Sequence, residues 1–267
     1  MTRARLDAIL TVAQQRVEGL RGRVQELERR AAGAPAPPPF GARSADGAVG
    51  VVAEVKRRSP SAGAIHAGLD AARHAQAYAA GGAIGVSVVT EAEHFGGSLE
   101  DLSRVAQAVA LPVLRKDFIL DELQLLEARG FGASAVLLIV RVLGPARLRV
   151  LGREARALGL GVLTEAHTVG ELDIALAAGA TLVGINNRDL DSFVVDPSTS
   201  ERLLPRIPAG VVAIAESGIA SRGDVERVAA AGADHVLVGT AVAHLAEPRE
   251  AVRALTGVPR RHRRGEE

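Results

Sequence analysis

Apolar positions divide the chain into a helical N-terminal part and a longer repeating part. From Leu6 to about Arg30 they recur at helical spacing with charged residues between them, which predicts one amphipathic helix or two. The stretch AGAPAPPPFG (32–41) then ends the pattern, because successive prolines cannot continue a helix. We expect residues 1–45 to form a helical extension with a proline-rich connector. Residues 46–257 would form the main domain, and 258–267 a basic flexible tail.

Eight short apolar runs rich in β-branched residues follow the connector. They lie at 50–56, 84–90, 111–118, 134–140, 160–166, 181–187, 210–217 and 234–240. Segments with helical spacing separate them, and several of these end in a glycine that suits a helix C-terminus. The runs are nearly continuous in apolar residues, as parallel strands covered on both faces are. This alternation predicts an α/β fold, a (β/α)₈ TIM barrel. The rival is an open doubly wound sheet, which usually needs fewer strands and often carries a G-x-G-x-x-G motif, absent here.

Composition narrows the class of protein. The net charge is +1, so no global charge favours nucleic acid or an anionic membrane surface. The chain has no cysteine, which excludes disulfides and cysteine-ligated metals. The N-terminus lacks the uninterrupted apolar stretch of a signal peptide, and the longest strongly apolar run, AVLLIV (135–140), is too short to span a bilayer. We therefore expect a cytoplasmic protein that binds neither nucleic acid nor membrane.

The two lysines stand at informative positions. Of the 32 lysine and arginine residues, only Lys56 and Lys116 are lysine, and all the others are arginine. Arginine keeps its proton in a protein, whereas a buried lysine shifts its pKa readily and can act as an acid or base. Lys56 ends the first predicted strand and Lys116 the third, at the barrel end that carries catalytic groups. We therefore expect both lysines to transfer protons or to supply an adjustable ammonium group.

Further polar residues end other predicted strands. Glu54 lies two residues before Lys56 and thus on the same side of its strand. Strand five ends at Glu165, strand six at Asn186, Asn187 and Arg188, and strand seven at Glu216 and Ser217. Because alternate strands contribute to common layers inside such a barrel, these groups should converge. Two ammonium groups and three carboxylates in one mouth would separate each other's pKa values and give acids and bases usable near neutral pH. Structural ion pairs lining the barrel top are the alternative.

Two loops have the composition of a phosphate site. ESGIAS (216–221) follows strand seven and VGTA (238–241) follows strand eight, and this barrel frequently binds phosphate there. Small residues expose backbone N–H groups, and a short helix N-terminus adds a favourable dipole. Ser59, in SPSAG after strand one, would add a hydroxyl. The seven histidines show no paired ligand spacing, so we expect no metal site, and His167 near the rim would be a loop or cap residue.

Eight stretches of the chain together carry a family resemblance. They are AEVKRRSPSAG, VVTEAEHFGGSLEDL, LPVLRKDFILDELQLLEARGFGA, LLIV, LTEAH, GINNRDLDSFVVD, AESGI and VLVGTAV, in this order. The chain resembles indole-3-glycerol phosphate synthase of tryptophan biosynthesis over about residues 5–255, extension included. Departures are mild: the family commonly has lysine at Ala62, an aromatic pair at His94 and Phe95, and often tyrosine at Leu123. No acid–base position is replaced.

The resemblance implies a decarboxylating lyase. Its substrate is 1-(2-carboxyphenylamino)-1-deoxyribulose 5-phosphate, which closes to indole-3-glycerol phosphate with loss of carbon dioxide and water. The implied catalytic residues are Glu54, Lys56, Lys116, Glu165, Asn186 and Glu216, with Lys116 as the general acid. The implied phosphate ligands are Ser59, Arg188, Ser217, Gly218, Gly239 and Thr240. The implied contacts to the anthranilate ring are Phe95, Phe118, Leu137 and Leu190, although ordinary core packing is an equal interpretation for Leu137.

The same resemblance sets expectations about cofactors and partners. The reaction needs no redox or electron-sink chemistry, so no cofactor is expected. We expect a small phosphorylated substrate and a monomer or weak oligomer, with other tryptophan-pathway enzymes as candidate partners.

Three other functions fit the same barrel. One is a Schiff-base aldolase with Lys56 or Lys116 as the nucleophile. Another is a non-catalytic phosphate-binding paralogue, which would have no need for proton donors at its strand ends. The third is a sugar-phosphate isomerase such as phosphoribosylanthranilate isomerase, which relies on a different acid–base pair. The fold alone does not decide among them, so the site must.

Overall fold

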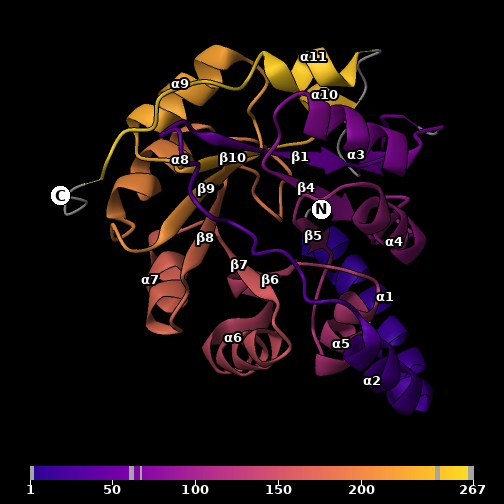
Figure 1. Cartoon of the computed structure of the whole chain (residues 1–267). Coiled ribbons are helices and arrows are strands. Elements are labelled where there is room, and N and C mark those ends of the chain that lie inside the picture. The colour runs from indigo at the N-terminus through magenta and orange to yellow at the C-terminus, as the bar shows by residue number, and fades with distance from the viewer. Residues whose placement is uncertain (1–2, 60–62, 67, 244–246, 264–267) are drawn as a thin grey trace.

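Eight parallel strands close into a barrel in the computed structural model, which describes residues 3–59, 63–66, 68–243 and 247–263 (Figure 1). The strands are β1 (Gly50–Val55), β4 (Gly85–Val89), β5 (Val113–Lys116), β6 (Ala135–Ile139), β7 (Gly161–Ala166), β8 (Leu182–Asn186), β9 (Val212–Glu216) and β10 (His235–Val238). They pair in the order β1-β10-β9-β8-β7-β6-β5-β4, and β1 also pairs with β4, which closes the ring. Each strand lies within the apolar run that predicted it, and the (β/α)₈ barrel is confirmed.

Helices surround the strands. They are α3 (Ala71–Ala80), α4 (Leu99–Ala108), α5 (Glu122–Gly130), α6 (Val140–Ala157), α7 (Val169–Ala177), α8 (Ser198–Leu203), η2 (Leu204–Arg206), α9 (Arg222–Ala230), α10 (Thr240–Ala243) and α11 (Pro248–Arg253). Side chains of Ser98, Thr168 and Ser221 accept backbone N–H groups at the starts of α4, α7 and α9, which fixes where these helices begin. None of the helices in the described part of the chain is long and apolar enough to cross a membrane.

A short hairpin follows β1 and was not predicted from the sequence. Its strands are β2 (Arg58–Ser59) and β3 (Gly63–Ala64), which pair antiparallel. Two-residue strands carry too little periodicity to be recognised in a sequence. Ala62, where the chain departs from the family pattern, lies outside the described residues.

The apolar core has two parts. The larger cluster fills the space between the strands and the surrounding helices and includes Val86, Leu138 and Val236. The second cluster fills the barrel interior, and it also contains Leu6 and Ile9 from the N-terminal extension. Because residues alternate between the two faces of each strand, both clusters draw on the same nearly continuous apolar runs.

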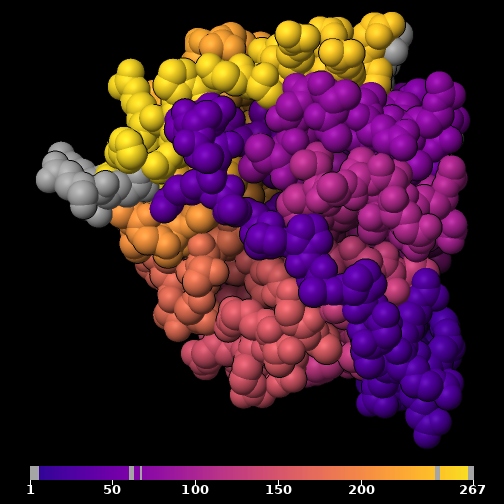
Figure 2. All heavy atoms as spheres, in the orientation of Figure 1, coloured from indigo at the N-terminus to yellow at the C-terminus, as the bar shows by residue number. Residues whose placement is uncertain are grey.

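The N-terminal extension runs along one side of the barrel. It consists of α1 (Arg3–Leu20), η1 (Arg21–Arg23) and α2 (Val24–Gly33), so the two-helix interpretation of the pattern is correct. α2 lies beside α5 (Figure 1), where Arg30 donates a hydrogen bond to the carbonyl of Gly130. The connector then crosses the face seen in Figure 2. Phe40 of the connector packs against the interior cluster. The extension therefore contacts the barrel through both its helical part and its connector.

The C-terminal segment is bound to the barrel as far as it is described. Nη1 of Arg260 lies 2.7 Å from one oxygen of Asp234, and Nη2 of Arg263 lies 2.9 Å from the other. Arg43 of the connector also pairs with Asp234, and the side chain of Arg263 is buried. The flexible tail expected over 258–267 stays a prediction, and its described part, 258–263, makes these contacts with the barrel. The basic residues were expected to be solvated, whereas Arg260 and Arg263 pair with a buried carboxylate distant in the sequence.

Candidate active site

A cavity of about 520 Å³ lies at the carboxyl ends of the strands. Every site residue predicted from the sequence lines it, namely Glu54, Lys56, Ser59, Phe95, Lys116, Phe118, Leu137, Glu165, Asn186, Arg188, Leu190, Glu216, Ser217, Gly218, Gly239 and Thr240. The barrel brings them together because most of them follow or end a parallel strand, and all parallel strands end at the same rim, while Leu137 points inward from the middle of β6.

Lys116 occupies a cluster of carboxylates inside the cavity. Its Nζ lies 3.1 Å from Oε2 of Glu165 and 3.2 Å from Oε2 of Glu216. The two glutamate side chains are almost fully buried, and that of Lys116 is 17% exposed. The ammonium group is therefore open to the cavity on one side and bound by carboxylates from β7 and β9 on the other.

This arrangement separates the pKa values of the three groups. Burial acts to lower the pKa of Lys116, but the charges of Glu165, Glu216 and Glu54 outweigh it and raise that pKa, so Lys116 is an ammonium ion. Burial also raises the pKa of Glu216 to about 7, with the charge of Glu165 adding to the effect. The pKa of Glu165 lies below its ordinary value, because the charges of Lys116 and His167 overcome burial. Glu216 can therefore exchange a proton near neutral pH while Glu165 stays ionised.

The second lysine forms its own pair. Nζ of Lys56 lies 2.5 Å from Oε1 of Glu54, and this carboxyl keeps a lowered pKa because the charges of Lys56 and Lys116 overcome its burial. A Cβ atom at Gly239, after β10, would collide with the Glu54 carboxylate and crowd the Lys56 ammonium. The absence of a side chain at Gly239 thus makes room for the Lys56–Glu54 pair. Gly239 is also one of the predicted phosphate ligands.

The loop after β9, part of the predicted phosphate site, begins with a tight turn. Ser217 and Gly218 both adopt left-handed conformations, with φ of 65° and 77°. Asn187 holds this turn, since its side-chain amide donates to the carbonyl of Ser217 at 2.9 Å and its side-chain oxygen accepts from Ser200. The two adjacent positive φ values make a tight turn at the carboxyl end of the barrel, where this class of barrel frequently binds phosphate. The first of the two adjacent asparagines, Asn186, faces the cavity and hydrogen-bonds Glu165, whereas the second is structural.

The rest of the predicted phosphate site comes from three other elements. Thr240 begins the short helix α10 directly after β10 and lines the cavity. Ser59 of β2 is largely buried at the cavity wall. The guanidinium of Arg188 also lines the cavity, and its Nη1 donates to the carbonyl of Phe193 at 2.9 Å. One side of the mouth therefore offers backbone N–H groups, hydroxyls and a guanidinium.

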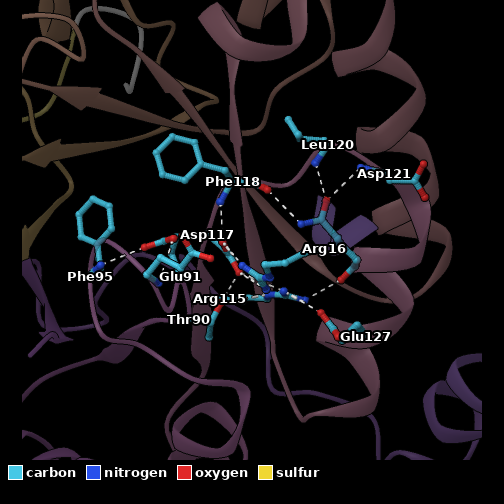
Figure 3. Close-up of polar contacts among 12 residues, drawn as sticks. Arg16, Thr90, Glu91, Phe95, Arg115, Asp117, Phe118, Leu120, Asp121 and Glu127 are labelled. Carbon is cyan, nitrogen blue, oxygen red and sulfur yellow. Dashed lines mark hydrogen bonds and ion pairs between the residues drawn. The ribbon is translucent and has the colours of Figure 1, made fainter. Parts of the chain in front are cut away.

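The opposite side of the cavity is apolar. Phe118, Leu137 and Leu190 belong to the interior cluster, with Phe95 packed against it. Leu137 thus serves both core packing and the cavity wall, which are the two interpretations that its position in the sequence allowed. Glu91 fixes the loop that carries Phe95, because its carboxylate accepts the backbone N–H of Phe95 at 2.9 Å (Figure 3).

Sequence reasoning missed other residues that line or support the cavity. Leu6 and Ile9 of α1 line it, and no local pattern separates them from ordinary core positions of an amphipathic helix. His167 was assigned to a cap. It does donate its backbone N–H to Glu171 near the start of α7, but its ring also lies beside Glu165. The spacing of two residues that placed Glu54 beside Lys56 applies equally to Glu165 and His167, and that signal was available.

A closed parallel barrel with acid–base groups at one mouth, beside the loops of the predicted phosphate site, is typical of an enzyme of the (β/α)₈-barrel class. The model of the family "Indole-3-glycerol phosphate synthase" matches residues 6–255. Proteins of that name from Mycobacterium avium and Mycobacterium tuberculosis H37Rv are 44% and 45% identical to this chain over 249 residues, covering 92% of both sequences in each case. The chain belongs to the indole-3-glycerol phosphate synthase family.

Solved structures of more distant proteins share the barrel. The 3-hexulose-6-phosphate synthase of Salmonella typhimurium has a TM-score of 0.63 at 17% identity and covers 78% of this chain and 96% of its own. The thiamine phosphate pyrophosphorylase of Pyrococcus furiosus has a TM-score of 0.60 at 15% identity, covering 78% and 93%. At such low identity these structures support the fold and nothing further.

Proposed function

We propose that this chain converts 1-(2-carboxyphenylamino)-1-deoxyribulose 5-phosphate to indole-3-glycerol phosphate, releasing carbon dioxide and water. Membership of the family supports this reaction. The observation that carries it in this chain is the position of Lys116, an ammonium between two buried carboxylates that is still open to the cavity. Ring closure of this substrate requires a proton donor at that kind of position.

Ring closure is the first step. The ring carbon that bears the carboxylate attacks the ribulose carbonyl carbon, a carbon–carbon bond forms, and the carbonyl oxygen gains negative charge. Lys116 donates a proton to that oxygen. An ammonium near the developing charge stabilises the transition state more than the ground state, and such acid–base assistance typically contributes about 10²–10⁴-fold. Glu165 orients the ammonium group of Lys116 from the side away from the cavity. It also positions or deprotonates the groups around the closing ring.

Loss of carbon dioxide restores the aromatic ring, and loss of water completes the indole. The carbon–carboxylate bond breaks and its electrons return to the ring; the new hydroxyl then takes up a proton and leaves as water, while the neighbouring carbon of the new ring gives up a proton to form the double bond. Lys56 and Glu54 act on the substrate carboxylate and in the later dehydration. Asn186 and Glu216 complete the polar network of the site. Glu216 suits proton exchange in these steps, since its pKa is about 7.

The remaining residues orient the substrate. Ser59, Arg188, Ser217, Gly218, Gly239 and Thr240 bind the phosphate at one side of the mouth. Phe95, Phe118, Leu137 and Leu190 contact the anthranilate ring at the other side. Anchoring both ends of the substrate brings the ring carbon and the carbonyl together before reaction, which lowers the entropic cost of closure.

The raised pKa of Lys116 argues against the Schiff-base alternative. A nucleophilic lysine must lose its proton, whereas the charges of three carboxylates outweigh the burial of Lys116 and favour its ammonium form. Three further predictions come from the sequence. The chain would act as a monomer or weak oligomer, it would have other tryptophan-pathway enzymes as candidate partners, and it would be located in the cytoplasm.

The test is a direct assay with a matched variant. The purified chain is incubated with the carboxyphenylamino ribulose phosphate, and indole fluorescence is followed for the wild type and for Lys116→Ala. Fluorescence that appears with the wild type and disappears with the variant supports the reaction and the role of Lys116. If the wild type binds a substrate analogue but forms no indole, the non-catalytic phosphate-binding function replaces the proposal. Borohydride trapping of a covalent adduct would instead favour the aldolase.

A further inference from the structure

His167 lies between two carboxylates behind the cavity. Its Nδ1 is 3.0 Å from Oε2 of Glu171, and its Nε2 is 3.5 Å from Oε1 of Glu165. The side chain is 4% exposed, and Nε2 has no hydrogen-bond partner at ordinary distance. A buried ring nitrogen without a close partner is costly, so its direction toward Glu165 calls for an explanation.

The contact with Glu171 fixes the orientation of the ring. Glu171 lies in the first turn of α7, and the same Oε2 also accepts the backbone N–H of His167 at 2.7 Å. Its other oxygen lies 3.0 Å from Nε of Arg141. With the ring held at Nδ1 by an anchored carboxylate, the remaining nitrogen has a fixed direction toward Glu165.

Glu165 is held on both sides. Oε2 faces Nζ of Lys116, and Oε1 faces the ring of His167. Arg141, in the first turn of α6, also binds Asp189 and Asp191 from the loop after β8, so its charge is largely neutralised. The charged groups near the imidazole are therefore Glu165, Glu171, Arg141 with its two aspartates, and Lys116 beyond Glu165.

We propose that His167 is a positioning residue for Glu165, which it holds in one orientation and keeps ionised by donating a hydrogen bond from Nε2 when substrate occupies the cavity. This inference rests on the proposed reaction, because it assigns the supporting group of one of its residues. A carboxylate bound at both oxygens cannot rotate away from Lys116, so the ammonium stays directed at the substrate.

The electrostatics agree with a cationic imidazole. Burial acts to lower the pKa of His167, but the hydrogen bond to Glu171 and the charge of Glu165 outweigh it and place that pKa above its ordinary value. In return, the charge of His167 contributes to the lowered pKa of Glu165. Loss of this charge should therefore raise the pKa of Glu165, so that Glu165 becomes protonated at higher pH.

Two substitutions separate the two contacts. In His167→Asn the side-chain amide takes the place of Nδ1, which keeps the bond to Glu171 but loses the contact with Glu165. In His167→Gln the amide takes the place of Nε2, which offers Glu165 a donor without charge. We expect His167→Asn to lower kcat about 10-fold with KM nearly unchanged, because a misplaced acid–base group affects the chemical step.

The pH profile of kcat is the decisive measurement. The acid limb should move to higher pH by about one unit in both variants, because neither carries the positive charge. His167→Gln should nevertheless recover most of the wild-type kcat at its optimum. His262→Asn is the control for a histidine outside the cavity and should leave the profile unchanged. A wild-type acid limb in both variants would overturn the inference, even if kcat fell, because a purely structural residue would give that result.

A second measurement does not depend on the substrate. The ring nitrogens of the histidines are titrated by ¹⁵N NMR in the wild type and in Glu165→Gln, with His167→Asn used to assign the signal. The pKa of His167 should fall in Glu165→Gln because the neighbouring negative charge is lost. If the wild type forms no indole product, the proposed function fails while this titration still reports on the pair. An unchanged pKa in Glu165→Gln would overturn the inference itself.

Discussion

Two consecutive residues of β5, Arg115 and Lys116, carry the same charge in opposite surroundings. The side chain of Arg115 lies outside the barrel, fully buried, and donates to Thr90, to the carbonyl of Gln124 and to the carboxylates of Asp117 and Glu127 (Figure 3). The side chain of Lys116 lies inside, where carboxylates approach it on one side and the cavity remains on the other.

The difference explains why this arginine-rich chain keeps a lysine at position 116. A planar guanidinium with five donors suits a closed network, since several acceptors can bind it at once and none needs to move. A compact ammonium on a flexible stem can remain bound to carboxylates and still give a proton to a substrate. One strand thus separates a structural charge from one that we propose to be catalytic, by the alternation of its side chains.

Exchange of the catalytic lysine should have the largest effect. Lys116→Arg keeps the charge but removes the donatable proton and enlarges the group, so we expect turnover to fall by about 10³-fold. Indole fluorescence measures turnover, and the thermal unfolding midpoint shows whether the fold persists. Binding of a phosphate-bearing substrate analogue should be preserved. Turnover within tenfold of the wild type would contradict the acid role of Lys116.

Removal of the structural arginine should instead destabilise the fold. Arg115→Met leaves Asp117 and Glu127 buried without their main partner, and breaking one side of a buried ion pair costs about 3 kcal/mol or more. Urea unfolding measures the free energy of unfolding. Turnover per folded molecule should change far less than in Lys116→Arg. A loss below about 1 kcal/mol would mean that water or neighbouring donors replace the guanidinium.

Glu216 allows a test of the catalytic side through stability. Its folded pKa of about 7 lies above the unfolded value, so the native state binds the proton more tightly and the free energy of unfolding falls as pH rises from about 4.5 to 7. Glu216→Gln should therefore stabilise the fold by about 3 kcal/mol at pH 8 and have little effect at pH 4. Denaturant unfolding at the two pH values checks this. An equal change at both would exclude a raised pKa.

The link between the network and the N-terminal extension should give the smallest effect. Arg16 of α1 binds both oxygens of Asp117, at 3.2 and 3.0 Å, and α1 also carries Leu6 and Ile9 on the cavity wall. We expect Arg16→Ala to cost about 1–2 kcal/mol of stability and to raise KM a few-fold.

Arg23→Ala is the matched control for this effect. Among the described residues, Arg23 forms an ion pair only with Glu26, and both side chains are exposed. Exposed ion pairs contribute little to the free energy of unfolding, so Arg23→Ala should change neither stability nor KM. If Arg16→Ala behaved like Arg23→Ala, the ion pair with Asp117 would have no role in holding the extension against the cavity.

Much of the site was predictable because strand ends in a parallel barrel meet at one rim. Lys116 and Glu165 lie far apart in the sequence, yet each ends a continuous apolar run, and that is sufficient to place both in the mouth. The hairpin β2–β3 was too short to leave a pattern. The bound segment 258–263 was missed because the buried partner of its arginines, Asp234, is recognisable only in three dimensions.

The sequence by itself determined the barrel, the rim residues and the family, because strand periodicity and residue type are local properties. Only the tertiary structure decided which charge faces which. It placed Glu216 beside Lys116, where burial raises the pKa of Glu216 and the charges of the carboxylates raise the pKa of Lys116. It also turned the ring of His167 toward Glu165. Desolvation and pairing depend on distances between separate strands, and no local pattern in the chain contains those distances.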